Sequence, residues 1–375
     1  MTRPKVFVAR QIPEAGLGPS LAACEVEVWT ERLPPSAEVL RAKVRDCDGL
    51  VTLLTDKVDD ALLAVAPKLK VVSNFAVGVN NIDLPAATAR KIPVGNTPGV
   101  LTEATADIAV TLLLAAARRL GESSADAKEG RWITWEPLGW LGCDLVNRTL
   151  GIVGMGRIGF ATAKRLHHGW GMKVLYTARS AKPDADRELG AKRVEQDELL
   201  SQSDFVSVHA DLNPTTKGMF GAEQFRKMKR TAVFVNTARG PHVNQAALAE
   251  ALRSGTIFAA GLDVTDPEPL PPSHELYQLP NCVIAPHIAS ATTDTRNAMA
   301  RLCADNLLAG VLFHEKSPCP ASILSCSFSS PPRCSAREPR PTTTARSACG
   351  SGSPTRCSAT SSNRSGTPTA RSATR

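Results

Sequence analysis

Short apolar runs alternate with longer amphipathic stretches over the first hundred residues. The apolar runs are bounded by polar or turn residues, and they predict strands at Lys5–Ala9, Val26–Trp29, Gly49–Leu53, Lys70–Asn74 and Pro93–Asn96. Between them, Ser36–Arg45 and Asp59–Ala66 show helical spacing. Alternation of strand and helix is typical of a parallel sheet that is covered by helices.

A longer helix is predicted next, over Thr102–Leu120, with Thr102 as its N-cap and Gly121 as its end. A second alternating series follows, with strands at Leu150–Val153, Val174–Tyr176, Phe205–Val208, Ala232–Asn236, Ala259–Asp263 and Val283–Ala285. The pattern therefore predicts an α/β protein with two doubly wound parallel-sheet domains.

The composition changes abruptly after about Glu315. Ser, Thr, Pro, Arg and Cys dominate residues 316–375, and large apolar residues are rare there. Such a segment cannot offset its ordering entropy by burial, so we expect a disordered low-complexity tail. A non-native reading frame or splice-derived end is favoured over a functional basic tail.

The net charge of +8 comes from this tail rather than from the body. Of 44 Lys and Arg and 36 Asp and Glu, nine basic residues and one acid fall in 316–375, which leaves 35 of each sign in 1–315. A formally neutral body argues against a nucleic-acid partner. The longest apolar stretch, Ile108–Ala117, is about half as long as a membrane span, so we expect a buried helix and no membrane partner.

Ten cysteines are present, and the body holds five of them singly, without the paired spacing of a zinc or redox motif: Cys24, Cys47, Cys143, Cys282 and Cys303. The N-terminus leads directly into a strand instead of a secretory signal. We therefore expect reduced structural thiols, no metal site and a cytoplasmic location.

A glycine-rich turn follows the strand Leu150–Val153 and opens a helix. Its sequence, G-M-G-R-I-G from Gly154 to Gly159, fits the dinucleotide fingerprint, in which the glycines permit a tight turn, close approach of the pyrophosphate and helix–strand packing. The helix N-terminus adds free N–H groups for phosphate. A tight turn without a ligand is the alternative, but the context favours a dinucleotide site at Gly154, Gly156, Arg157, Ile158 and Gly159.

The end of the following strand bears on the choice of cofactor. NAD enzymes usually place Asp or Glu there to hold the ribose hydroxyls. Here Thr177 takes that place, and Arg179 and Ser180 follow. A guanidinium and a hydroxyl can bind a 2′-phosphate that a carboxylate would repel, so the sequence favours NADPH over NADH. A solvent-exposed Arg179 without a role is the alternative.

Three segments in the second half lie at or just beyond predicted strand ends, where open α/β sheets bind ligands: Asn236–Gly240, Gly261–Pro269 and Ala285–Ser290. Reduction of a 2-keto acid needs a cation for the substrate oxygens, a proton donor, and a group that keeps the donor charged. Arg239, His287 and Glu268 can provide these functions in turn. Each side chain alone is more often structural, but their combination in this order favours catalysis.

Residues 1 to about 312 resemble the D-isomer-specific 2-hydroxyacid dehydrogenase family, and within it the glyoxylate reductase/hydroxypyruvate reductase branch. The resemblance is carried by Gly151–Gly159, Val235–Gly240, Gly261–Pro269 and Pro286–Thr292, with branch features at Trp132–Leu138 and Asn306–Gly310. It implies NADPH-dependent reduction of glyoxylate or hydroxypyruvate to a D-2-hydroxy acid. It also implies a Rossmann cofactor domain at 101–285 and a flavodoxin-like substrate domain at 1–100, completed by 286–312.

The resemblance implies a role for each site residue as well. Arg239 would orient the substrate, Glu268 would tune His287, and His287 would protonate the carbonyl oxygen. The side chain of Asp263 and the backbone of Thr237 would meet the nicotinamide carboxamide.

Four further residues would bind substrate. The N–H groups of Val77 and Gly78 would hold its carboxylate, with Ser290 nearby. Trp140 would reach in from the partner subunit of a homodimer formed through the long helix Thr102–Leu120 and the segment Gly121–Asn147, although core packing is an equal interpretation for Trp140.

Two features depart from the family pattern. Pro241 and His242 replace an acidic and an aliphatic residue, which removes a backbone donor after the Arg239 loop and predicts a slight distortion there. The family-like body stops near Phe313, where the tail begins. The alternatives are a family member acting on phosphoglycerate, formate or D-lactate, a dinucleotide-sensing corepressor of the C-terminal-binding-protein type, and a catalytically impaired truncated relative.

Overall fold

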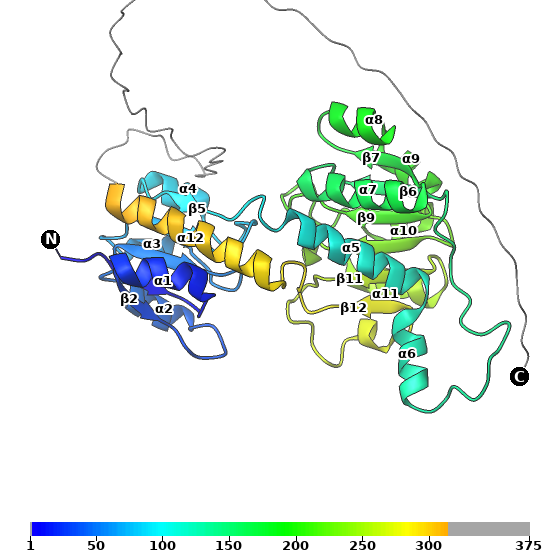
Figure 1. Cartoon of the computed structure of the whole chain (residues 1–375), viewed down its shortest axis with the longest axis horizontal. Helices are drawn as coiled ribbons and strands as arrows, with labels where there is room; N and C mark the ends of the chain where they lie inside the picture. Colours follow the sequence, from blue (N-terminus) through cyan, green and yellow to red (C-terminus); the bar gives the residue numbers. More distant parts are fainter. Residues whose placement is uncertain (1, 314–375) are drawn as a thin grey trace, which may run out of the picture. The chain divides into compact units, whose positions relative to one another are not determined.

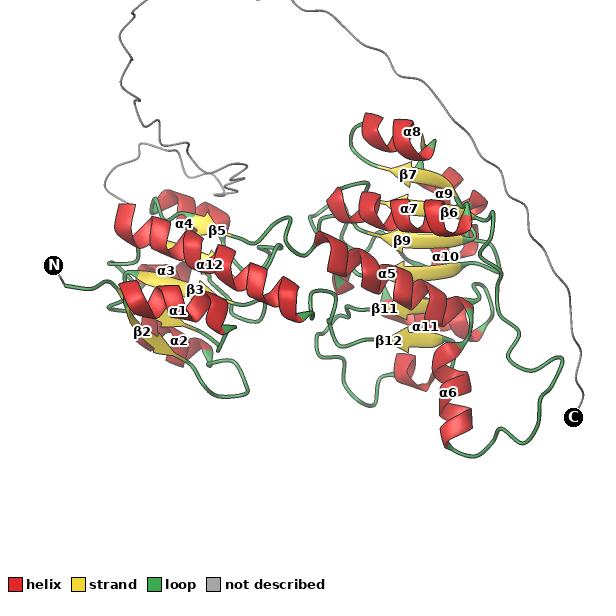
Figure 2. Ribbon diagram, viewed as in Figure 1, coloured by secondary structure: helices red, strands yellow, loops and turns green. Residues whose placement is uncertain are grey.

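The computed structural model describes residues 2–313, and the predicted tail at 316–375 lies outside this range (Figure 1). Two parallel sheets organise the described chain (Figure 2). The first has five strands in the order β2-β1-β3-β4-β5, and the second has seven in the order β12-β11-β10-β9-β6-β7-β8. The prediction of two doubly wound parallel sheets is confirmed.

The first sheet consists of β1 (Lys5–Val8), β2 (Glu25–Val28), β3 (Gly49–Thr52), β4 (Val71–Asn74) and β5 (Val94–Gly95). Its helices are α1 (Glu14–Ala23), α2 (Ala37–Val44), α3 (Asp60–Ala64) and α4 (Leu84–Ala89). Two of these helices begin at side-chain N-caps. Ser36 accepts the Val39 N–H at the start of α2, and Asp59 accepts the Leu62 N–H at the start of α3. Alternate strand residues face α2–α4 on one side and α1 on the other.

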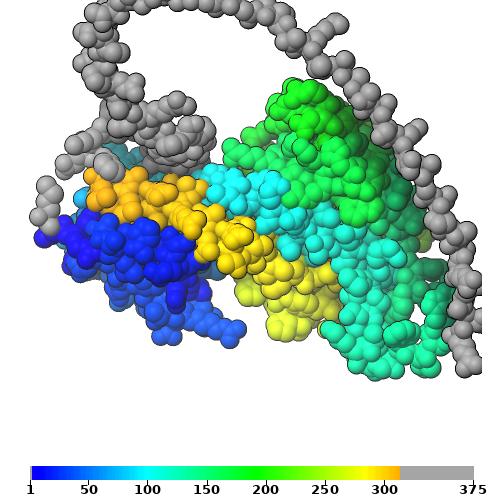
Figure 3. All heavy atoms as spheres, in the orientation of Figure 1, coloured from blue at the N-terminus to red at the C-terminus, as the bar shows by residue number. Residues whose placement is uncertain are grey.

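The last described helix, α12 (Thr293–Phe313), returns to this first sheet and packs beside α1 (Figure 3). Met299, Cys303 and Leu307 of α12 are buried against valines of β1, β3 and β4. Polar contacts tie the same elements, because Ser73 Oγ donates to the Cys303 carbonyl at 2.7 Å and Asn306 Nδ2 to the Asn96 carbonyl at 2.9 Å. Residues more than 200 positions apart therefore form one core.

The second sheet consists of β6 (Thr149–Val153), β7 (Lys173–Thr177), β8 (Lys192–Arg193), β9 (Phe205–Val208), β10 (Val233–Asn236), β11 (Ala259–Leu262) and β12 (Cys282–Ile284). One face packs against α5 (Thr102–Ala117), α7 (Arg157–Trp170) and α8 (Pro183–Leu189). The other is covered by α9 (Gln196–Gln202), α10 (Ala222–Lys227) and α11 (Gln245–Arg253). Short 3₁₀ helices occupy Gly240–His242 and Glu275–Gln278.

The predicted helix Thr102–Leu120 begins at Thr102 as expected, but the capping role of Thr102 and the predicted end are wrong. Thr102 is the first helical residue rather than a side-chain cap, and α5 ends at Ala117. Arg119 then adopts a left-handed conformation with φ 53°, and α6 (Leu120–Lys128) continues through Gly121, which was expected to end the helix. Arg119 pairs with Glu122 in the first turn of α6, which favours this restart over the glycine stop.

Strand β8 was not predicted, because its two residues, Lys192 and Arg193, are both exposed and carry no apolar signal. The five cysteines of the body are free. Within residues 2–313, no helix is both long enough and apolar enough to cross a membrane. The same residues contain no cluster of three or more His, Cys, Asp or Glu side chains that could hold a metal.

Candidate active site

A cavity of about 670 Å³ is lined by loops that follow the carboxyl ends of strands in both sheets. The first sheet contributes loops after β1, β3 and β4, and the second contributes loops after β9, β10, β11 and β12. The carboxyl edge of a parallel sheet is the usual ligand-binding edge, because helix N-termini and connecting loops converge there. Arg239, Glu268 and His287, predicted from three separate segments, all line this cavity.

His287 and Glu268 form a hydrogen-bonded pair. Nδ1 of His287 meets Oε1 of Glu268, which leaves Nε2 as the ring nitrogen free to act on a ligand. The His287 side chain is 24% exposed and that of Glu268 is 40% exposed, so solvent reaches both. A carboxylate at this position orients the imidazole through Nδ1.

Asp263 holds the loop that carries His287. Its Oδ1 accepts the Ile288 N–H at 2.7 Å and its Oδ2 accepts the Ala289 N–H at 2.9 Å. Burial raises the pKa of Asp263, and these two N–H groups lower it. His287 itself has a left-handed backbone with φ 53°, which is costly for a non-glycine residue and needs support of this kind.

The guanidinium of Arg239 lies directly against the backbone of Gly78. A Cβ placed on Gly78 would fall 1.8 Å from Nη2 of Arg239, so only glycine permits this approach. Nη1 of Arg239 donates to the Ala238 carbonyl at 2.7 Å. Burial lowers the pKa of Arg239, whereas the charges of Glu268 and Asp211 raise it.

The distortion expected from Pro241 is not seen in the placement of Arg239. Pro241 lies in the first turn of the 3₁₀ helix Gly240–His242, where a missing N–H costs little. The buried Asn236 fixes the loop instead, because its Nδ2 donates to the Arg239 carbonyl at 2.8 Å and its Oδ1 accepts the Ala238 N–H at 3.0 Å. The side chain of Arg239 consequently stays in the cavity.

Two asparagines orient the loop at Val77 and Gly78. Asn96 Nδ2 donates to the Val77 carbonyl and Asn74 Nδ2 donates to the Gly78 carbonyl, each at 2.8 Å. Within residues 2–313, neither the Val77 nor the Gly78 N–H donates a hydrogen bond. The two carbonyls are thus hydrogen-bonded to side-chain amides, whereas the two N–H groups have no partner among the described residues, and Gly78 lies against the Arg239 guanidinium.

The glycine-rich turn has the geometry of a phosphate cradle. Gly154 has φ +98°, and a Cβ there would lie 2.6 Å from the Ala210 nitrogen. A Cβ on Gly156 would meet no described atom within 4 Å, and one on Gly159 would lie 2.3 Å from the Gly154 carbonyl oxygen. The first and third positions therefore require glycine for packing, while open space beside Gly156 at the start of α7 suits a pyrophosphate. Arg157 and Ile158 begin α7, and Ile158 lines the cavity.

The remaining predicted residues are spread around the site. Thr177 ends β7, and Arg179 lies beyond it in ion-pair distance of Asp211. Ser180 is exposed on the same turn. Thr237 and Ser290 line the cavity, and the buried Oγ1 of Thr237 has no hydrogen-bond partner in the described chain.

Two predicted residues lie outside the cavity lining. Asp263 is 1% exposed and supports the His287 loop, so its contact with the nicotinamide carboxamide stays a prediction. Trp140 lies about 5.0 Å beneath the guanidinium carbon of Arg119 and is 40% exposed, so it does not belong to the core of the described chain. Its approach from a partner subunit stays a prediction as well.

Sequence reasoning missed four ionisable residues of the cavity: Arg10, His209, Asp211 and Arg296. Arg10, His209 and Asp211 follow β1 and β9, so the rule that strand ends bind ligands could have found them. Arg296 lies on α12 with its guanidinium 5.9 Å from the Phe75 ring, and no local signal marks it. Burial lowers the pKa of Arg296, and the nearby charge of Asp263 raises it.

The fold and this site define a dinucleotide-binding α/β dehydrogenase, and comparison with known proteins specifies the family. The family described as D-isomer specific 2-hydroxyacid dehydrogenase, NAD binding domain, matches residues 110–289. A glyoxylate reductase from Korarchaeum cryptofilum is 51% identical over 308 residues, which cover 82% of this chain and 92% of that protein. The glyoxylate reductase/hydroxypyruvate reductase of Homo sapiens is 48% identical over 310 residues, covering 82% and 94%.

A solved structure agrees with these sequence relatives. The NADPH-dependent glyoxylate/hydroxypyruvate reductase from Sinorhizobium meliloti, in complex with NADP and malonate, superposes with a TM-score of 0.73 at 34% identity, covering 82% of this chain and 93% of that one. The chain therefore belongs to the D-isomer specific 2-hydroxyacid dehydrogenase family, which confirms the resemblance seen in the sequence. Its cofactor is a nicotinamide dinucleotide.

Proposed function

We propose that this chain reduces glyoxylate or hydroxypyruvate to the corresponding D-2-hydroxy acid with NADPH. The observation that carries the proposal is the Glu268–His287 pair, which lines one cavity together with the Arg239 guanidinium. An orienting carboxylate, a proton donor and a cation are the groups that carbonyl reduction requires. Relatives named for this reaction, at about half identity over most of their length, support the same substrate class.

The substrate carboxylate binds between Arg239 and the loop at Val77 and Gly78. The guanidinium supplies charge and forked donors, and the two backbone N–H groups supply further hydrogen bonds. His287 lines the same cavity, which supports its action on the neighbouring keto oxygen. Ser290, in the same lining, provides a hydroxyl for the polar end of the substrate.

Proton transfer is the task of His287. A bound reduced nicotinamide supplies the hydride for the keto carbon. As negative charge develops on the keto oxygen, Nε2 of the imidazolium donates its proton there, and Glu268 stabilises the charged ring beforehand through Nδ1. Arg239 stabilises the developing oxyanion by its positive charge. Asp263 acts as a positioning residue that holds the His287 loop.

The residues present fit a nicotinamide dinucleotide. Open space beside Gly156 suits the pyrophosphate, and the unpartnered Oγ1 of Thr237 suits a polar group of the nicotinamide half. We propose NADPH as the preferred form because β7 ends in Thr177 rather than an acid, and because Arg179 and Ser180 offer a cation and a hydroxyl for the 2′-phosphate.

Steady-state assays test this proposal directly. The purified chain is mixed with NADPH or NADH and with glyoxylate, hydroxypyruvate, pyruvate and 3-phosphohydroxypyruvate, and oxidation is followed at 340 nm. We expect the largest kcat/KM for NADPH with glyoxylate or hydroxypyruvate. Deletion of 316–375 should leave the rate unchanged. Tight NADPH binding without turnover of any keto acid would instead favour the sensor or impaired-enzyme alternatives, which the reductase relatives do not support.

We further propose a homodimer that forms through α6 and the segment after it. Large apolar side chains are exposed along this stretch: Leu120, Trp132, Ile133, Trp135, Leu138, Leu141 and Val146. A concentration of exposed apolar surface marks an interaction site, and Figure 3 shows this segment at the surface. Light scattering should give twice the chain mass, and Trp135→Ser together with Leu138→Ser should give the monomer mass.

We also propose a role for each of the two domains. Packing of α12 on the first sheet supports a substrate domain of 1–100 completed by 286–312, and packing of α5 on the second supports a cofactor domain of 101–285. The cytoplasmic location stays a prediction.

A further inference from the structure

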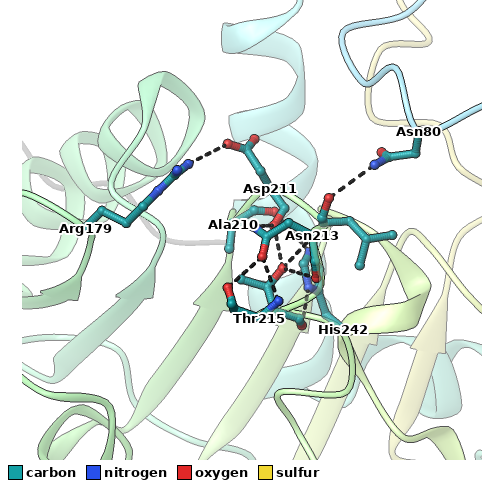
Figure 4. A network of polar contacts seen from close by, with 9 residues as sticks. Asn80, Arg179, Ala210, Asp211, Asn213, Thr215 and His242 are labelled. Carbon is teal, nitrogen blue, oxygen red and sulfur yellow. Dashed lines mark hydrogen bonds and ion pairs between the residues drawn. The ribbon is translucent and has the colours of Figure 1, made fainter. Parts of the chain in front are cut away.

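Arg179 and Asp211 face each other across the carboxyl edge of the second sheet (Figure 4). Nη2 of Arg179 lies 3.6 Å from Oδ2 of Asp211, and the side chains are 90% and 88% exposed. An ion pair this exposed is weak, because water screens both charges. A ligand anion can therefore displace the carboxylate from the guanidinium at little cost.

The position of Asp211 is set by its loop rather than by the ion pair. The two ring nitrogens of the buried His242 meet the Ala210 carbonyl at 3.0 Å and the Thr216 carbonyl at 2.9 Å. Oγ1 of Thr216 donates to the Asp211 carbonyl at 2.7 Å. As Figure 4 shows, Asn80 Nδ2 also donates to the Leu212 carbonyl, at 3.2 Å. The backbone carbonyls of Ala210, Asp211 and Leu212 thus all accept side-chain hydrogen bonds, which hold this loop in place.

The same loop adjoins the predicted cofactor cradle. A Cβ on Gly154 would lie 2.6 Å from the Ala210 nitrogen, so the residue before Asp211 packs against the glycine-rich turn. Arg179 follows β7, the strand whose end usually carries the ribose-binding acid in NAD enzymes. Here that position is Thr177, and the nearby carboxylate comes from the loop after β9 instead.

We propose that Asp211 limits the preference for NADPH by competing with the 2′-phosphate of the cofactor for the Arg179 guanidinium. The inference rests on the proposed function, in which NADPH binds with its 2′-phosphate near Arg179. Asp211 repels a 2′-phosphate and occupies its cation, whereas the unphosphorylated ribose of NADH leaves the ion pair intact. Asp211 is accordingly a determinant of cofactor choice that lies far from β7 in the sequence.

Direct binding measurements isolate this effect from catalysis. Dissociation constants for 2′,5′-ADP, 5′-AMP, NADPH and NADH are measured by calorimetry with the wild type, Asp211→Asn, Arg179→Met and the double variant. Asp211→Asn should bind 2′,5′-ADP and NADPH about three- to fivefold more tightly, as expected for release of an exposed ion pair, without any gain for 5′-AMP or NADH. Arg179→Met should bind 2′,5′-ADP about tenfold more weakly.

The double variant separates competition from a general charge effect. If Asp211 acts through Arg179, its substitution should bring little gain once Arg179 is replaced. Asp184→Asn removes another exposed carboxylate, one that pairs with Arg187 on α8, and serves as the matched control. An equal gain in that control, in 5′-AMP binding or in the Arg179→Met background would overturn the inference.

The same measurements distinguish a failure of the proposed Asp211 role from a failure of the proposed function. A wild type that binds neither dinucleotide would overturn both. A wild type that binds NADPH and oxidises it with a keto acid, but whose ratio of NADPH to NADH affinity is unchanged by Asp211→Asn, would overturn the role of Asp211 alone.

Discussion

The backbone N–H of Ile288 donates a hydrogen bond of 2.7 Å to Oδ1 of Asp263, a side chain that is only 1% exposed. The second oxygen of Asp263 accepts the Ala289 N–H, so one carboxylate holds two successive residues directly after His287. Because His287 has a left-handed backbone, this clamp keeps the imidazole beside Glu268. The position of the proposed proton donor thus depends on a buried side chain that does not line the cavity.

Asp263→Asn tests the clamp. The amide replaces one acceptor with a donor that would face a backbone N–H, so we expect a loss of about 1–3 kcal/mol in the free energy of unfolding and a kcat at least about tenfold lower. Urea unfolding and steady-state kinetics measure the two effects. Asp266→Asn, at an exposed neighbouring position, should change stability by less than about 0.5 kcal/mol. Wild-type stability and rate in Asp263→Asn would refute the clamp.

His287→Ala tests the proton donor. Its kcat should fall by about 10²–10⁴, while the Kd for NADPH should change by less than about twofold, because the imidazole acts on the substrate oxygen. Glu268→Gln keeps the imidazole but removes the carboxylate that orients it, so kcat should fall in this variant too, with the Kd for NADPH nearly unchanged. Loss of NADPH binding by His287→Ala would assign the histidine a structural role.

Gly78→Ala tests the contact between the substrate loop and the Arg239 guanidinium. The new methyl group would occupy the space of Nη2, so either the loop or the guanidinium must move. We expect KM for the keto acid to rise at least about tenfold, with the NADPH Kd little changed. Gly169→Ala is the matched control, because a Cβ there meets nothing within 4 Å. Equal kinetics in the two variants would contradict the proposed carboxylate site.

We predict that His209 makes the free energy of unfolding decrease as the pH falls. Burial lowers the pKa of this histidine from 6.5 to about 3, and its Nε2 meets Ser207 Oγ at 2.9 Å. As the pH falls, His209 is therefore protonated near pH 6.5 in the unfolded chain but only near pH 3 in the folded chain. The contribution of neutral His209 is fully present above pH 6.5 and declines between 6.5 and 3, by up to about 1.4 kcal/mol per pH unit.

Denaturant unfolding between pH 7 and pH 4 measures the slope of the free energy of unfolding against pH. His209→Asn should flatten it relative to the wild type, and His168→Asn, which removes an exposed imidazole, is the surface control. A wild-type slope in His209→Asn would show that other groups cause the acid sensitivity.

Much of the fold and the catalytic set followed from local patterns in the sequence. Apolar runs such as Phe205–Val208 and Val233–Asn236 became buried strands, because strands covered on both faces need continuous apolar segments. The strand–turn–helix order around Gly154 marked the cofactor turn, and the strand-end rule marked Arg239 and His287. The local stop signal at Gly121 failed, because the Arg119–Glu122 pair favoured a second helix.

Only the tertiary structure decided which distant residues meet. Gly78 and Arg239 lie in loops that follow strands of different sheets, and they are in contact. Asp211 follows β9, whereas its partner Arg179 follows β7. Arg296 enters the cavity from a helix that returns to the first sheet at the end of the described chain. Periodicity and propensity act over a few neighbouring residues, so a single sequence specifies its elements and strand ends. Contacts between loops arise only when packing brings the strand ends together, and they carry no local signal.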